Sequence, residues 1–273
     1  MNAYFRKKKA LANKGSYYAK HKEQIFGSAA QRAKVPPAPP ISDELRAKFE
    51  QGRVILIDKP LHWTSFDAVR KVRNALRIKK VGHAGTLDPL ATGLLIICTG
   101  KFTKKINEYM AAEKEYTGSF TLGATTPTYD MESSPTDFKD FSGISPEALQ
   151  AVAKEFTGTL QQVPPIYSAI KKDGVALYEL ARRGVDVELQ PRTVTITQFE
   201  ITQVHLPVVS FRVVCSTGTY IRSLAHDVGA SLECGAYLSA LRRTRIGVSA
   251  VEEAVSIETF LADLQTANPG AGS

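Results

Sequence analysis

The residue types that could do chemistry gather in one stretch, Gly82–Gly93, which reads GHAGTLDPLATG. It holds a single carboxylate, Asp88, with one histidine, His83, five positions earlier. Pro89 disfavours the α conformation at Asp88 and favours extended backbone there. A lone carboxylate held on such a loop can serve as a nucleophile or base at a sugar carbon. Aspartates are also common in ordinary turns, so spacing alone leaves a structural role for Asp88 open.

Two features of the sequence help to decide between a structural and a chemical role for Asp88: the nearby glycines and the absence of a second carboxylate. Gly82, Gly85 and Gly93 let the backbone turn sharply, and we expect them to let a large ligand approach. The loop leads into the apolar run Leu94–Cys98, which would give a site rigid support. Glycosidases use a second carboxylate as acid, and no local motif provides one here. The leaving group should then need little protonation, and a uracil that leaves its ribose as a stabilised anion meets this condition.

Other classes of site are not indicated. The chain has neither a G-x-S-x-G nor a G-x-G-x-x-G string, and its three cysteines, Cys98, Cys215 and Cys234, form no C-x-x-C pair. This favours reduced thiols in a cytoplasmic protein and argues against a disulfide framework or a zinc site. We therefore expect no metal and no cofactor. No apolar run is long enough to cross a membrane, and no signal peptide opens the chain.

The net charge of +8 is concentrated at the N-terminus. Residues 1–40 hold nine basic side chains and one acid, so the remaining 26 basic and 26 acidic side chains balance. A basic arm on a neutral body suggests attachment to a polyanion, most simply nucleic acid. A solvated tail without a specific partner, or less readily a transit peptide, remains open. The arm ends in VPPAPP, residues 35–40, which is typical of a stiff spacer.

Helices are predicted at three places. Residues 63–76 begin with the capping pair Thr64 and Asp67, followed by apolar residues at helical spacing: Phe66, Val69, Val72 and Leu76. Residues 145–158 carry serine and proline at the start and glycine at the end. Residues 218–232 form the third segment.

Apolar runs predict strands at residues 53–60 and 93–100, both expected to be buried, and further strands at residues 208–217 and 242–251. Residues 115–123 alternate, with Tyr116, Phe120 and Leu122 on one face. Strands and helices mix without a regular βαβ rhythm, so the sequence favours an α+β fold.

Six segments, in this order along residues 52–250, resemble motifs of the TruB family, the tRNA pseudouridine-55 synthases. They read VILIDKPLHWTSFDAVRKVR, GHAGTLDPLATGLLIICTG, EKEYTGSFTLGATTPTYD, QQVPPIYSAIKKDGVALYELARRG, CSTGTYIRSLAHDVG and YLSALRRTRIG. The resemblance implies the pseudouridine synthase fold, a mixed, largely antiparallel sheet flanked by helices with the active-site cleft across it. It also implies isomerisation of uridine 55 in the tRNA T-loop: base flipping, cleavage of the N-glycosidic bond, rotation of uracil and reattachment through C5.

The resemblance assigns roles residue by residue. Asp88 matches the catalytic aspartate, which attacks C1′ or sets off glycal formation, and Arg222 matches the arginine that pairs with it. Tyr116 matches the tyrosine that stacks on the target base and is implicated in removing the C5 proton. Four further positions match substrate-binding residues: His83, which fills the gap left by the flipped base, Tyr220, Lys59 and Leu241.

Tyr220 and Arg222 are two positions apart, so they could not share one face of a helix. We therefore expect the GTYIR string to begin extended and to enter its helix only at Ile221–Arg222.

The expected domain organisation has three parts. Residues 1–50 form a basic, proline-rich arm expected to be disordered, and residues 51–250 form the catalytic domain, with an RNA-clamping insertion at 163–192. Residues 251–273 are expected to be a short tail, too short for the C-terminal domain of PUA type that many family members carry. The arm could replace part of the phosphate contact of that domain, unless the start codon is misassigned.

The expected partner is the T arm of tRNA, with no obligatory protein partner. Three alternatives are a synthase acting on another RNA, a guide-RNA-dependent synthase, and an RNA-folding factor acting independently of catalysis. The 163–192 insertion favours tRNA, and the set of Asp88, Tyr116 and Arg222 argues against loss of catalysis.

Overall fold

The central element is a mixed sheet, seen in a computed structural model that describes residues 41–168, 171–172, 174–185 and 187–267. Its strands follow the order β1 (Val54–Lys59), β3 (Ala91–Thr99), β10 (Ala236–Ile246), β4 (Lys114–Leu122), β9 (Val208–Cys215), β8 (Arg192–His205) and β5 (Gly158–Gln162). In addition, β2 (Val81–Ala84) pairs with β3, and β11 (Ser249–Ala250) pairs with β10. The β3–β10 pair is parallel and the other pairs are antiparallel, which confirms the predicted α+β fold.

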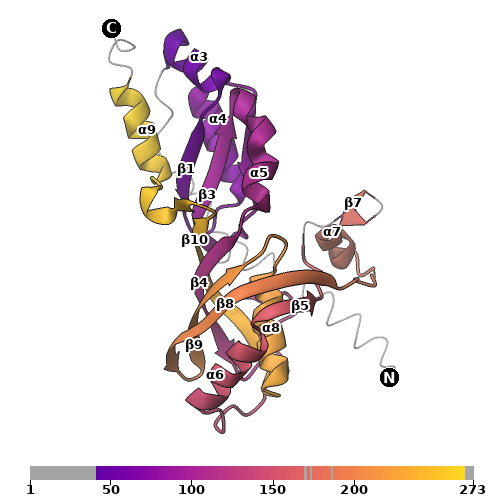
Figure 1. Cartoon of the computed structure of the whole chain (residues 1–273). Helices are drawn as coiled ribbons and strands as arrows, with labels where there is room; N and C mark the ends of the chain where they lie inside the picture. The colour runs from indigo at the N-terminus through magenta and orange to yellow at the C-terminus, as the bar shows by residue number, and fades with distance from the viewer. Residues whose placement is uncertain (1–40, 169–170, 173, 186, 268–273) are drawn as a thin grey trace.

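Helices cover the two ends of this sheet (Figure 1). One end carries α3 (Asp43–Gln51), α4 (Ser65–Leu76), α5 (Ile106–Ala111) and α9 (Ile257–Thr266), with the short 3-10 helices at Gly100–Lys105 and Val251–Glu253. The other end carries α6 (Pro146–Glu155) and α8 (Ile221–Ser231). Within the expected insertion, α7 (Leu177–Arg182) follows a hairpin of β6 (Lys171–Lys172) and β7 (Val175–Ala176), and Figure 1 shows it beside the main sheet. No helix in the described part of the chain has the length and apolar character to span a membrane.

The three predicted helices are confirmed, with one correction to α4. Thr64 and Asp67 form the predicted capping box at its start, and Val69, Val72 and Leu76 are buried. Phe66 was predicted on the buried face, but it is 57% exposed. Small residues such as Ala68 complete the buried face instead, because they fit closely against the sheet.

The strand predictions hold except for the burial of β1. Tyr116, Phe120 and Leu122 lie on the buried face of β4, as their alternation predicted. We expected β1 to be buried throughout, yet only alternate residues are buried, because one of its faces lacks full cover.

The expectation of disorder is wrong for the last residues of the arm. Residues 43–50 of that segment belong to α3, which ends at Gln51, and within the expected C-terminal tail residues 257–266 form α9. The reason is apolar burial: Leu45 and Phe49 of α3 pack against the same cluster as Phe260 and Leu261 of α9. The basic segment and its proline-rich spacer, residues 1–40, lie outside the described residues.

The packing of α9 predicts a large stability contribution from the end of the chain. Leu261→Ala should lower the free energy of unfolding by about 2–5 kcal/mol, because it removes a buried side chain and leaves a cavity. Urea denaturation measures this change. Gln265→Ala, an exposed position on the same helix, is the matched control and should stay within about 0.5 kcal/mol of the parent. Equal effects would show that α9 does not pack as described.

Candidate active site

Asp88 lies on the loop between β2 and β3, and this catalytic loop is fastened to the segment that enters α4. The Oγ of Ser65 accepts a hydrogen bond from Leu87 N–H at 2.8 Å and lies 3.2 Å from the Leu87 carbonyl oxygen, to which it donates. His62 N–H donates to the Pro89 carbonyl at 2.8 Å. The backbone groups on both sides of Asp88 are therefore fixed by hydrogen bonds, one set from the Ser65 side chain and one from the His62 backbone.

Two of the loop glycines, Gly82 and Gly93, lie where an added side chain would collide with the protein itself. A Cβ at Gly93, where φ is +99°, would collide with the backbone of Arg243 on the neighbouring strand β10. A Cβ at Gly85, where φ is +83°, would lie 3.4 Å from the Arg243 guanidinium. One at Gly82 would meet Ile106. Close packing of β3 against β10 requires glycine at position 93, and the positive φ favours glycine at position 85.

Arg222 pairs with Asp88, as the resemblance implied. Its Nε lies 3.0 Å from Oδ2 of Asp88 and its Nη2 lies 3.4 Å from Oδ1, so both carboxylate oxygens are held. The Arg222 side chain is 7% exposed and the Asp88 side chain 39%. The arginine thus orients the carboxylate from the interior and leaves its other side open to the pocket.

A second carboxylate, Asp130, contacts the same guanidinium at 3.7 Å. It is the last residue of the quoted TTPTYD segment, and no sequence pattern singled it out. Burial raises the pKa of Asp130, and the nearby Arg222 charge opposes that rise. Arg222 also donates to the carbonyls of Thr128 and Tyr167, at 3.3 and 3.1 Å. These contacts fix the Arg222 side chain, and Asp130 is suited to positioning that arginine.

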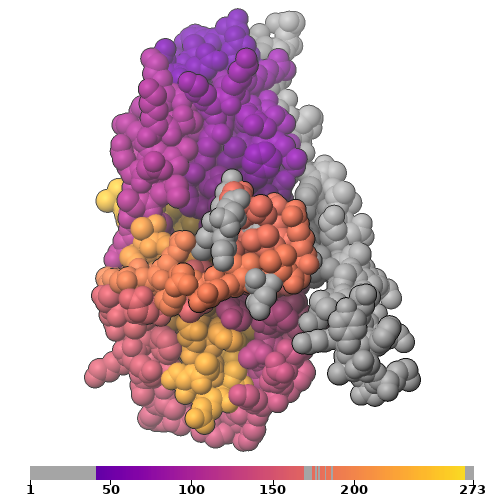
Figure 2. Space-filling model, turned by 90° about the vertical axis from the view of Figure 1, so that its right-hand side faces the viewer, coloured from indigo at the N-terminus to yellow at the C-terminus, as the bar shows by residue number. Residues whose placement is uncertain are grey.

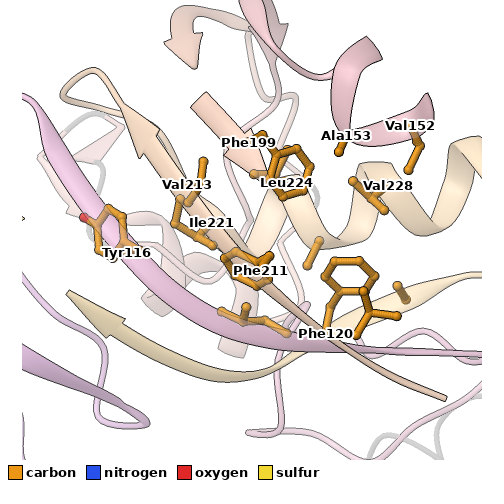
Figure 3. Packing of buried hydrophobic residues seen from close by; sticks show 14 of the residues in the cluster. Tyr116, Phe120, Val152, Ala153, Phe199, Phe211, Val213, Ile221, Leu224 and Val228 are labelled. Atoms are coloured by element: carbon orange, nitrogen blue, oxygen red, sulfur yellow. The ribbon is translucent and has the colours of Figure 1, made fainter. Parts of the chain in front are cut away.

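Tyr116 has a ring in the core and a hydroxyl directed out of it. Figure 3 shows the ring at the edge of the cluster that contains Phe211, with its oxygen pointing away from the other labelled side chains. Burial raises the pKa of Tyr116, and the Arg243 guanidinium opposes this rise. Arg243 is itself buried and donates to the carbonyls of Leu94 and Gly85, at 2.8 and 3.0 Å. Arg243 therefore links β3, the catalytic loop and Tyr116, a role that sequence reasoning missed.

A pocket opens beside the Asp88 carboxylate. Leu241 of β10 lines it, as do Asp130 and Arg222. Tyr220 has extended backbone at the start of α8, which confirms the predicted late entry into the helix. The side chain of Gln162 bonds both backbone polar groups of Tyr220, accepting from N–H at 2.8 Å and donating to C=O at 3.1 Å.

Lys59 and His83 lie near the catalytic loop rather than in the pocket lining of the described residues. Lys59 is fully buried, and its ammonium donates to the carbonyls of Pro60 and Trp63, at 2.9 and 2.6 Å. Burial lowers the pKa of Lys59 to about 8, although the Asp88 charge opposes that fall. Burial also lowers the pKa of His83, which lies on β2 opposite Ile97 of β3.

Comparison with known proteins decides the family. The family model described as "TruB family pseudouridylate synthase (N terminal domain)" matches residues 73–221. The model described as "tRNA pseudouridylate synthase B C-terminal domain" matches residues 222–270. The chain belongs to the TruB family. A relative in Flavobacterium johnsoniae, named tRNA pseudouridine synthase B, is 52% identical over 225 residues, which is 80% of this chain and 98% of the relative. A relative of the same name in Phocaeicola vulgatus is 48% identical over 218 residues, 78% of this chain and 93% of the relative.

Solved structures with a similar fold are also known. The chain is similar to one in "Crystal Structure of a Cbf5-Nop10-Gar1 Complex", with a TM-score of 0.63 and 29% identity. It is also similar to one in "Structure of H/ACA RNP bound to a substrate RNA containing 2'-deoxyuridine", with a TM-score of 0.61 and 26% identity. In both cases the match covers 85% of this chain and 61% of the solved chain, so this chain spans less than two thirds of their length.

The buried Lys59 predicts a pH-dependent contribution to stability. The folded chain releases this proton near pH 8, whereas the unfolded chain keeps it up to about its ordinary pKa of 10.5. Between these values the unfolded state binds more protons, so the Lys59 contribution to stability rises with pH. We expect the unfolding free energy of wild type minus that of Lys59→Met to increase from pH 8 to 10, measured by urea denaturation. A difference that is flat across this range would contradict burial of the ammonium.

The Ser65 contacts predict that this hydroxyl holds the catalytic loop. Ser65→Ala leaves the buried Leu87 backbone groups without their partner, which should cost about 1–3 kcal/mol of stability. Hydrogen exchange at Leu87 should also become faster. Ser142→Ala, which removes an exposed hydroxyl bonded to Asp140, is the control and should change neither measurement. Unchanged exchange at Leu87 in Ser65→Ala would exclude the holding role.

Proposed function

We propose that this chain converts uridine 55 in the T-loop of tRNA to pseudouridine. The single observation that carries this proposal is the Asp88 carboxylate, held at both oxygens by a buried arginine beside an open pocket. The relatives named tRNA pseudouridine synthase B, at 52% and 48% identity, support tRNA as the substrate.

In the proposed reaction the target uridine leaves its stack and enters the pocket, at a cost in stacking energy that pocket contacts offset. Asp88 attacks C1′ or triggers glycal formation, the N1–C1′ bond breaks, and uracil leaves as an anion. Uracil then rotates, C5 bonds to C1′, and the C5 proton is lost while N1 gains one. Atoms and charge balance, and the Asp88 carboxylate is regenerated.

The remaining residues receive supporting roles in this proposal. The Tyr116 ring is proposed to stack under the base, and its hydroxyl, which points away from the core, to remove the C5 proton. Leu241, which lines the pocket, is proposed to contact the uracil together with Tyr220. His83 fills the stack that the flipped base leaves, and Lys59 supports the turn beside the catalytic loop. Residues 163–192 clamp the RNA.

The proposed partner is the T arm of tRNA, and the proposed location is the cytoplasm. The three cysteines are free and buried, as expected of reduced thiols. The basic segment 1–40 is proposed to add phosphate contacts. The similarity to a chain in an H/ACA RNP bound to a substrate RNA makes an RNA other than tRNA the second candidate substrate.

The decisive experiment incubates the protein with unmodified tRNA transcript and maps pseudouridine at single-nucleotide resolution. We expect product at position 55 without any guide RNA, and no product from Asp88→Asn, which keeps the shape but lacks the charged nucleophile. Binding of the variant to tRNA should stay within a few-fold of wild type. Asp263→Asn, on the exposed side of α9, is the control. Turnover by Asp88→Asn, or product elsewhere in the tRNA, would overturn the proposal.

A further inference from the structure

Positive charge is unevenly spread over the body of the protein. Residues 41–273 carry 26 basic and 26 acidic side chains, yet residues 65–87 carry six basic side chains and a single acid, Asp67. This segment contains α4 and the turn into β2. A local excess of this size in a neutral body needs a partner of opposite charge or a solvated surface.

Four residues of this segment form a row along α4 and its C-cap, here called the α4 stripe: the exposed Phe66, Arg70 and Arg77 and the half-buried Arg73. The spacing of four and three residues places Phe66, Arg70 and Arg73 on one face of the helix, and Arg77 follows as the C-cap. Phe66 is 57% exposed and the Arg70 side chain 53%, and the Arg73 guanidinium lies 5.9 Å from the Phe66 ring centre. Arg70 also pairs with Asp67 at 2.7 Å, which partly neutralises that end of the stripe.

The far end of the stripe borders an open hollow on the surface. Arg73 and Arg77 line this hollow together with Asn74, Ile78 and Lys79. Arg77 has left-handed backbone, with φ of 51°, so α4 ends and the chain turns beside the hollow. Three cations and an amide around one hollow suit the oxygens of a phosphodiester.

The near end of the stripe is tied to the catalytic loop. Ser65, which bonds Leu87, is the residue immediately before Phe66, and Leu87 is the residue before Asp88. From there Phe66 to Arg77 spans about 16 Å at the helical rise of 1.5 Å per residue. Figure 2 shows the violet surface of this part of the chain directly above the orange-red residues of the insertion.

We propose that the α4 stripe binds the sugar–phosphate backbone of the tRNA outside the flipped nucleotide, with Arg73 and Arg77 on phosphates and Phe66 stacked against a base. This rests on the proposed function and deepens it, since an RNA strand with one base beside Asp88 must continue past the catalytic loop. A guanidinium group can bind two phosphate oxygens at once, and an exposed aromatic ring can stack against any base.

The test measures tRNA affinity against salt for Arg73→Gln/Arg77→Gln. Loss of two phosphate contacts should weaken binding and reduce the slope of log K against log salt by about 1.4–1.8, at 0.7–0.9 per contact. Arg73→Lys/Arg77→Lys keeps both charges and should keep the slope. Phe66→Ala should weaken binding about 5-fold or more at an unchanged slope, because stacking releases no counterions.

The matched control is Lys139→Gln/Lys154→Gln, which removes two exposed cations in and just before α6, at the other end of the molecule (Figure 1). It should leave affinity and slope as in wild type, and thermal unfolding checks that every variant is folded. An unchanged slope in Arg73→Gln/Arg77→Gln, or an equal change of slope in the control, would overturn the proposal that the α4 stripe binds RNA. If the wild-type protein still modifies tRNA while the α4 variants give either of these results, the proposed function stands and only the α4 proposal fails. If the wild-type protein neither binds nor modifies tRNA, the proposed function itself is overturned.

Discussion

The site depends on one buried guanidinium. Arg222 holds both oxygens of Asp88, approaches Asp130, and donates to two carbonyls from other segments. Removal of one member of a buried ion pair typically costs about 3–5 kcal/mol, because a charge is left without compensation. Four separate stretches of chain are therefore placed relative to one another by the same group that orients the carboxylate.

The sheet gives this arrangement a rigid base. β10 lies between β3 and β4, so the strand that follows the catalytic loop and the strand of Tyr116 are held by a common neighbour. Arg243 on β10 bonds the backbone at Gly85 and Leu94. The close approach of β3 and β10 leaves no room for a side chain at Gly93. The packing of β3 against β10 therefore also fixes the position of the catalytic loop.

The chemistry needs only one free carboxylate. Asp130 is buried and shares the guanidinium, whereas Asp88 keeps an open side toward the pocket. This division fits a reaction in which uracil leaves as an anion and is then reattached, so no strong acid is required to protonate the uracil. The second carboxylate serves the arginine, which is a different use from the paired acids of glycosidases.

The sequence determined what local physics controls. It predicted the capping box of α4 and the alternation of β4, because backbone preference and side-chain period act over a few residues. The late start of α8 followed from the resemblance together with helix geometry, and the role of Asp88 as the reacting acid is proposed from the resemblance. The tertiary structure alone decided which distant groups meet. Arg222 stands 134 positions from Asp88, and the resemblance, rather than any local pattern, indicated that pair. Asp130, Ser65 and Arg243 gave no such signal, since their roles exist only once packing brings them to the loop. The same reason explains the exposed Phe66 and the ordered α3 and α9: apolar type alone does not show whether a surface is present to cover it.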